Sequence, residues 1–282
     1  MAEGERRSTD HPHAIIRKIT SEYNGKVSTM NRSEIELKSK NGYQIPCLFG
    51  SVPDQKAVII CLHGFAGSKR SPRIERLHEE MRGHRIGTFT FDWPAHGDSE
   101  ADFPNLTVEN CMQDLAVVYD YVQEKYGVPI WCFATSFGGY LAMIFHQRHP
   151  ESFGKIMLRS PALKMGQIMT AFMNTDQLRS FLDGSRMDFG TDQPLLLARD
   201  FYDDVCAHDA FSMPPAHPER IRIIHGDQDT VVPPEHSRDY AAEYGIDIHF
   251  LKGADHSYDR PGDVDWVMEQ AVEFFLNWHE TN

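Results

Sequence analysis

The chain has 282 residues, of which 41% are hydrophobic and 24% are charged, so it is long enough to bury a sizeable core and has the composition of a globular protein. Its formal net charge of −13 at pH 7 argues against nucleic acid or an anionic membrane as a partner, because both repel an acidic surface. The five cysteines lack a short paired spacing, and Cys61 and Cys132 lie in apolar runs, so we expect reduced thiols and no disulfide framework.

The first ten residues, Met1 to Asp10, are polar and lack the apolar core of a signal peptide. No stretch approaches the roughly 20 apolar residues that span a membrane. We therefore expect a cytoplasmic protein without a membrane span.

The N-terminal part of the chain predicts antiparallel strands. Residues 14–19 are a candidate edge strand, and apolar and charged residues alternate from Ser33 to Ser39, the pattern of a half-exposed strand. Asn41-Gly42 predicts a tight turn, after which Tyr43 to Phe49 forms the second arm of a hairpin.

From Ala57 onward, apolar runs alternate with helical patterns. Buried strands are predicted at residues 57–62, 87–91, the beginning of 131–141, 155–158, 221–224 and 246–251. Amphipathic helices are predicted after Ser71-Pro72, over 108–122, after Ser136, over 235–244 and over 264–278. This alternation predicts one α/β domain over 1–282, with a mostly parallel sheet and helices on both faces.

One interval, residues 162–218, interrupts this alternation with several short helical patterns, including one over Leu195 to Val205. An insertion of this size between two strands predicts a helical cap over the carboxyl edge of the sheet. Apolar side chains recur here at helical spacing, with one phenylalanine beside them: Met165, Met169, Phe172 and Met173. These residues either belong to the core or line an adaptable acyl or aromatic pocket.

The stretch from Trp131 to Leu141 starts as a strand and ends as a helix, with Ser136 between small residues. Ala134 and Gly138 permit an abrupt turn, although the usual pattern of this motif has glycine at both positions. A serine on a strained strand-to-helix turn projects its hydroxyl beyond the sheet, beside the positive end of the helix. The alternative is an ordinary turn in which the serine caps the helix.

Polar motifs follow the predicted strands in order. They are His63-Gly64-Phe65, Asp92-x-x-x-His96-Gly97-x-Ser99, the serine turn, His225-Gly226-Asp227-x-Asp229-x-Val231-Val232-Pro233, and Asp255-His256. Serine, acid and histidine in this chain order, each just past a strand end, resemble the α/β-hydrolase superfamily. The resemblance runs from about Ala57 to the C-terminus. Within the superfamily it is to capped bacterial carboxylesterases that include cinnamoyl and feruloyl esterases.

The resemblance implies a Ser136 nucleophile, a His256 base and an Asp229 acid. It implies an oxyanion hole made by the backbone N–H groups of Phe65 and Phe137. Asp227 is the rival acid, His249 falls within a strand, and His63, His96 and His225 are expected to support turns.

We expect no metal and no cofactor, because the histidines and cysteines lack metal-ligand spacing and no phosphate-binding loop is present.

The expected activity is hydrolysis of small-molecule carboxylic esters, feruloyl-like in the leading case. Lysophospholipase, monoacylglycerol lipase or thioesterase activity, and a non-catalytic ligand-binding role, are the alternatives. The oligomeric state stays open, a homo-oligomer included. A basic cluster of Lys69, Arg70, Arg73 and Arg76 either attracts an anionic substrate or is a solvated surface.

Overall fold

The computed structural model describes residues 17–23, 26–190 and 194–276. Its N-terminal part is antiparallel, with β1 (Arg17–Tyr23) pairing β2 (Lys26–Lys38) and β2 pairing β3 (Gln44–Gly50). The predicted hairpin between β2 and β3 is confirmed, and β2 begins seven residues earlier than the alternation indicated. Of the candidate edge strand at 14–19, residues 17–19 belong to β1, and the rest lie outside the described residues.

The remaining large strands form the parallel part of one nine-stranded sheet, in the order β1-β2-β3-β5-β4-β6-β7-β10-β11. They are β4 (Ala57–Leu62), β5 (Ile86–Phe91), β6 (Ile130–Thr135), β7 (Ile156–Arg159), β10 (Ile221–Gly226) and β11 (Asp247–Leu251). The helices between them are α1 (Pro72–Arg82), α2 (Val108–Tyr126), α3 (Phe137–Arg148), α7 (Pro234–Tyr244) and α8 (Asp263–Leu276). The predicted α/β architecture is confirmed; Trp278, assigned to the last helix, lies outside the described residues.

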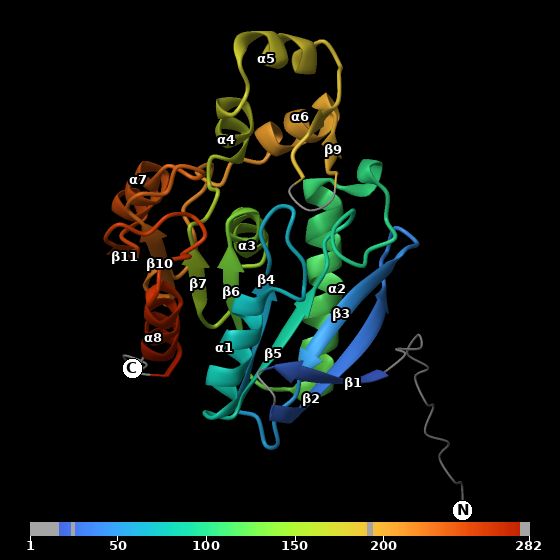
Figure 1. The fold of residues 1–282 in the computed structure, drawn as a ribbon, viewed down its shortest axis with the longest axis vertical. Coiled ribbons are helices and arrows are strands. Elements are labelled where there is room, and N and C mark those ends of the chain that lie inside the picture. The colour runs from blue at the N-terminus through green and yellow to red at the C-terminus, as the bar shows by residue number, and fades with distance from the viewer. Residues whose placement is uncertain (1–16, 24–25, 191–193, 277–282) are drawn as a thin grey trace, which may run out of the picture.

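Helices cover both faces of this sheet, as the alternation predicted (Figure 1). Side chains of β4 alternate between two apolar clusters. Val58, Ile60 and Leu62 pack on one face with α2, α3 and α7, whereas Ala57 and Ile59 pack on the other face with α1 and α8. A strand buried on both faces is continuously apolar, which explains the sequence pattern.

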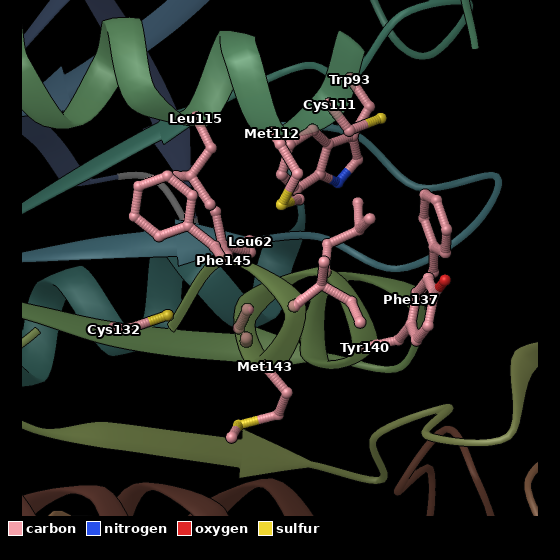
Figure 2. Packing of buried hydrophobic residues seen from close by; sticks show 14 of the residues in the cluster. Leu62, Trp93, Cys111, Met112, Leu115, Cys132, Phe137, Tyr140, Met143 and Phe145 are labelled. Atoms are coloured by element: carbon pink, nitrogen blue, oxygen red, sulfur yellow. The ribbon is translucent and has the colours of Figure 1, made fainter. Parts of the chain in front are cut away.

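Apolar packing between α2 and α3 fixes the position of α3, the helix that begins directly after Ser136. Figure 2 shows Met112 and Leu115 of α2 facing Tyr140 and Phe145 of α3. The Tyr140 hydroxyl, in turn, donates to the backbone carbonyl oxygen of His208, in the segment between β7 and β10, at 2.7 Å. The first turns of α3 are therefore fixed by packing on one side and by a hydrogen bond on the other.

The segment between β7 and β10 contains α4 (Met165–Ala171), α5 (Thr175–Leu182) and α6 (Arg199–Ala207), with a two-stranded sheet of β8 (Met187–Asp188) and β9 (Leu196–Leu197). In Figure 1 it lies beyond the carboxyl ends of β6 and β7. The predicted helix over 195–205 is wrong at its beginning, because β9 pairs with β8 and Leu195 N–H bonds the Asp188 carboxylate. That this segment acts as a cap over substrate stays a prediction.

No helix within the described residues is long and apolar enough to cross a membrane. All five cysteines are free thiols, and Cys206 is the exposed one. The remaining short elements are the 3₁₀ helices η1 (Phe103–Asn105) and η2 (Pro218–Arg220).

Candidate active site

Ser136 lies at the turn between β6 and α3 with backbone angles φ 52° and ψ −116°. A non-glycine residue in this region of φ/ψ space stores about 1–3 kcal/mol of strain. The surrounding chain holds it there, since its N–H bonds the Arg159 carbonyl and its carbonyl accepts from Tyr140 and Ala162. Its hydroxyl makes no capping hydrogen bond to the helix, so the helix-cap alternative does not describe this serine.

Small residues around Ser136 are required by close backbone contacts. A Cβ atom at Gly138 would lie 2.5 Å from the Leu62 carbonyl oxygen, and one at Gly139 would lie 2.7 Å from the Pro161 Cβ. A Cβ at Gly64 would stand 3.2 Å from the Ser136 Cβ. The sharp turn and the loop after β4 therefore pack directly against each other, as the sequence pattern indicated for the turn itself.

The predicted acid and base come together from two loops. Asp229 follows β10 and is 5% exposed, and His256 follows β11. The His256 Nδ1 lies 2.7 Å from the Asp229 Oδ2. Gly226 permits this approach, because a Cβ there would collide with the backbone of Ala254 and Asp255, just before the histidine.

The Asp229 carboxylate is stabilised in its charged form. Burial raises the pKa of this carboxyl, but hydrogen bonds from His225, His256 and the Val232 N–H outweigh it, so the pKa lies below its usual value. The N–H groups of Val231 and Val232 each donate to Oδ1 at 2.8 Å. An ionised acceptor requires His256 to carry its proton on Nδ1, which leaves a lone pair on Nε2.

His225 supports the same carboxylate from the other side. Its Nε2 lies 3.1 Å from the Asp229 Oδ2 and 3.1 Å from the Val232 carbonyl oxygen, which can only accept. His225 Nε2 therefore carries a proton, and Nδ1 lies 2.8 Å from the Ser237 hydroxyl. The expectation that this histidine supports the turn is confirmed. The rival acid, Asp227, instead accepts from the Gly253 N–H.

Ser136 and His256 line one cavity of about 190 Å³. The walls come from the loop after β4, the beginning of α1 and the ends of β6 and β7; they include Phe65, Ile74 and Phe133. Among the described residues no hydrogen bond joins the Ser136 hydroxyl to His256, although both face this space. Contacts of this kind are often long before substrate binds. The arrangement suits transfer of a proton from a hydroxyl to an imidazole.

The two predicted oxyanion residues are neighbours, with the rings of Phe65 and Phe137 edge to face at 5.3 Å. In the described part of the chain neither backbone N–H donates to a backbone acceptor in a turn, loop or cap, and that the two groups form an oxyanion hole stays a prediction. His63 holds the loop, since its Nδ1 lies 2.8 Å from the Gly64 carbonyl oxygen and its Nε2 accepts from the Trp93 N–H at 3.3 Å. Burial lowers the pKa of His63, so the ring is neutral in this role.

Two other histidines lie where the sequence placed them, His96 in a turn and His249 in a strand. His96 is buried, and its Nδ1 lies 2.9 Å from the Pro94 carbonyl oxygen within the loop after β5. His249 belongs to β11, the edge strand of the sheet, and its Nε2 lies 3.1 Å from the Asp247 carboxylate.

The residues between β7 and β10 that the sequence proposed for substrate binding do not line this cavity. Met165 and Met169 are buried in the main core, Met173 packs against it, and Phe172 is 57% exposed. Met173 also falls beyond the end of α4, so the stripe of three methionines is not one helical face. Their part in substrate binding stays a prediction. From the segment between β7 and β10, the rings that contact Phe65 are those of Phe189 and Phe201, which the sequence analysis did not single out.

The basic cluster after the loop is largely neutralised. Lys69 is 2% exposed and bonds Asp92 and Asp98, and Arg70 pairs with Glu34 and Asp98. Arg73 pairs with Asp259, and Arg76 with Glu80 and Asp265. These contacts weaken the idea of a free cationic surface. Within the described residues no group of three or more histidine, cysteine or carboxylate side chains could hold a metal ion.

Comparison with known proteins finds sequence matches to about half of the chain. A sequence family described as serine aminopeptidase, S33, matches residues 53–188. A Bacillus subtilis (strain 168) protein provisionally named as a 2-succinyl-6-hydroxy-2,4-cyclohexadiene-1-carboxylate synthase is 29% identical over 135 residues, 46% of this chain and 47% of that protein. The chain thus spans about half the length of the curated relative that it matches.

Solved structures match over most of the chain. Est1E from Butyrivibrio proteoclasticus, with ferulic acid bound, has a TM-score of 0.73 at 21% identity and covers 86% of this chain and 98% of its own. A monoacylglycerol lipase from Paleococcus ferrophilus has a TM-score of 0.61 at 18% identity. That match covers 83% of this chain and 98% of the lipase chain. With the sheet order and the turn at Ser136, these similarities show that the chain has the α/β-hydrolase fold, as its motifs predicted.

Proposed function

We propose that the protein is a serine hydrolase that cleaves carboxylic esters through an acyl-enzyme. The observation that carries the proposal is the hydrogen bond of 2.7 Å between Asp229 and His256, beside a cavity that also holds Ser136. A serine hydroxyl is a poor nucleophile near neutral pH and needs a base whose lone pair faces it. The tautomer that Asp229 selects leaves His256 Nε2 free for that role.

In the proposed reaction, Ser136 Oγ forms a bond to the ester carbonyl carbon while His256 Nε2 takes the hydroxyl proton. The N–H groups of Phe65 and Phe137 stabilise the resulting oxyanion, and one such donor is typically worth about 100–1000-fold in rate. Collapse breaks the bond to the alkoxy oxygen, which leaves as an alcohol with the proton from His256. Water then repeats the sequence on the acyl-enzyme and releases the acid.

The proposed substrates are esters with a small or aromatic acyl group. The cavity of about 190 Å³ is below the roughly 300–1000 Å³ of pockets for drug-sized ligands, which favours small groups close to Ser136. The bound ferulic acid in the Est1E structure motivates an aromatic acyl group as the first class to test. Long-chain acylglycerols, thioesters and aminoacyl amides form the comparison panel, and the monoacylglycerol lipase structure motivates the first of them.

The test is hydrolysis of short-chain p-nitrophenyl esters and methyl ferulate, together with labelling by a fluorophosphonate probe. We expect Ser136→Ala to abolish labelling and to lower kcat by roughly 10⁴–10⁶-fold. Ser71→Ala is the matched control, because Ser71 lines the same cavity and its side chain makes no helix-cap hydrogen bond. Labelling that survives in Ser136→Ala and disappears in Ser71→Ala would contradict the assigned nucleophile. A folded wild type that neither reacts with the probe nor turns over any ester would favour a non-catalytic ligand-binding role.

A further inference from the structure

A second feature of the cavity beside Ser136 is a buried arginine. Arg159 ends β7 directly opposite Thr135 of β6, the residue before the serine, and it is 7% exposed. Its Nε donates to the Thr135 hydroxyl at 3.3 Å, and its Nη1 donates to the His256 carbonyl oxygen at 3.2 Å. The guanidinium also lies 5.1 Å from the centre of the Tyr258 ring. Arg159 thus lines the same space as Ser136 and His256.

None of these contacts supplies a negative charge. Within the described residues no carboxylate forms an ion pair with Arg159, and the acceptors of its two hydrogen bonds are both neutral. Burial lowers the pKa of Arg159 to about 10, which leaves it charged at neutral pH. A buried cation without a counter-ion is costly, because the protein replaces little of the hydration that the cation loses.

Lys69 shows how the same fold treats another buried cation. It is 2% exposed, and its ammonium group contacts Asp92 at 2.6 Å and also Asp98. The fold therefore places carboxylates in contact with a buried cation at one edge of this region. Among the described residues it places none within ion-pair distance of Arg159, on which Asp229 and Asp259 act only from farther away. This difference indicates that the counter-ion of Arg159 arrives with a ligand.

A second guanidinium faces the same cavity. Arg73, near the beginning of α1, donates from Nη2 to Asp259 at 2.6 Å, and Asp259 is a largely exposed side chain. The Arg73 Nε is buried and has no acceptor among the described residues. Two arginines with unused donor capacity therefore border the space beside Ser136.

We propose that this cavity selects esters that carry a free carboxylate, and that Arg159, with Arg73 beside it, binds that carboxylate. The fork of N–H donors on a guanidinium matches a carboxylate in geometry and charge. The small cavity favours a short acid, such as the monoester of a dicarboxylic acid with a few carbons between its two carboxyl groups. This inference rests on the proposed ester hydrolysis and names the substrate class of the same site.

The test compares two matched substrate pairs in which a carboxylate is replaced by a neutral amide of the same shape. Methyl hydrogen glutarate and methyl glutaramate place the group on the acyl side, and 2-carboxyethyl and 2-carbamoylethyl butanoate place it on the alcohol side. Acid release is followed in a pH-stat. In wild type we expect the carboxylate member of one pair to be preferred. In Arg159→Gln we expect that preference to fall by about 10–100-fold, with partial recovery in Arg159→Lys.

Arg82→Gln is the matched control, because Arg82 is an exposed arginine at the far end of α1 and its loss should leave the preference unchanged. Equal losses on both members of each pair in Arg159→Gln would overturn the proposal. They would make Arg159 a positioning residue that acts through the carbonyl of His256.

A binding measurement separates this inference from the proposed hydrolysis. Glutarate is titrated calorimetrically into Ser136→Ala and into Ser136→Ala/Arg159→Gln. We expect the Kd for glutarate to be at least tenfold higher in the double variant than in Ser136→Ala. Glutarate binding that depends on Arg159 in a protein that hydrolyses no ester would contradict the hydrolysis and support the carboxylate site. Glutarate binding that is absent, or equal in the two variants, would overturn the carboxylate site.

Discussion

Two buried aspartates in this protein behave in opposite ways. Asp229, after β10, is 5% exposed, and its pKa lies below the usual value despite burial. Asp114, on α2, is fully buried between that helix and the β2–β3 hairpin, and burial raises its pKa to about 6. The Asp229 carboxylate accepts from two backbone N–H groups and faces two histidines. Among the described residues, the Asp114 carboxylate accepts only from the hydroxyls of Ser39 and Tyr43.

The difference shows that burial alone does not decide the charge of a carboxyl group. Desolvation is the largest single influence on both pKa values, and the number and strength of the donors decide which way each carboxyl moves. The loop after β10 turns its backbone N–H groups toward Asp229, while the N–H groups around Asp114 are used within a helix. The first carboxylate is suited to hold a histidine in one tautomer, and the second to fasten a hairpin to a helix.

The largest expected difference in kcat is between the variants in which one or the other carboxylate is neutralised. Asp229→Asn should lower kcat for a short p-nitrophenyl ester by about 10⁴-fold, because an amide no longer selects the tautomer with a free Nε2 lone pair on His256. Asp114→Asn, at comparable burial, should leave kcat within about threefold of wild type. Steady-state kinetics at pH 7.5 on both variants provide the measurement. Similar losses in the two variants would remove the functional distinction between the sites.

A smaller effect is expected when each carboxylate loses one donor. His225→Gln should lower kcat by about 10–100-fold with KM little changed, because Asp229 loses a partner that stabilises its charge. Tyr43→Phe removes one donor from Asp114 and should leave kcat unchanged. Circular dichroism establishes that both variants are folded before their kinetics are compared. An unchanged kcat in folded His225→Gln would mean that His256 and the backbone N–H groups are enough to stabilise the charge of Asp229.

The smallest expected effect is on the free energy of unfolding, whose pH dependence should include a contribution from Asp114. The pKa of Asp114 is about 6 in the folded protein, above roughly 3.9 in an unfolded chain, so the folded state binds the proton more tightly. The contribution of Asp114 to the free energy of unfolding is therefore fully present below about pH 4, and it is lost as the pH rises through about 6. Relative to Asp114→Asn, wild type should lose about 2–3 kcal/mol of unfolding free energy between pH 4 and 7. Urea denaturation at several pH values measures this, and parallel curves for the two proteins would contradict it.

The sequence predicted those parts of the fold that depend on local pattern. A continuous apolar run located β4, because that strand is buried on both faces of the sheet. Alternation of apolar and charged residues located the hairpin of β2 and β3, because one face of a hairpin strand is exposed. The turn at Ser136 was also predictable, since the small residues Ala134 and Gly138 flank the serine. The structure gives the reason for the glycine, because Gly138 has no room for a side chain. The segment at 162–218 was harder. Short helices and two-residue strands leave little periodicity, so Leu196 and Leu197 were assigned to a helix although they form β9.

The residues that the sequence analysis did not identify are those whose role depends on distant partners. Asp114 looks like one polar residue on an amphipathic helix until Ser39 and Tyr43, more than 70 residues earlier, are placed against it. Gly226 was identified as part of a motif, but its close contact with Ala254 is visible only when the end of β10 is packed against the loop after β11. A weak signal did exist for Arg159, a cation at the end of an apolar strand.

The sequence by itself determined the α/β order of elements, the serine turn and the chain order of serine, acid and histidine, because periodicity and tight turns are properties of neighbouring residues. The tertiary structure decided which charges are compensated. Lys69 and Arg159 are both buried cations near strand ends, yet one meets two carboxylates and the other faces the cavity beside Ser136. Charge compensation acts over a few ångströms of space between loops far apart in the chain, and no local pattern of residues records that distance.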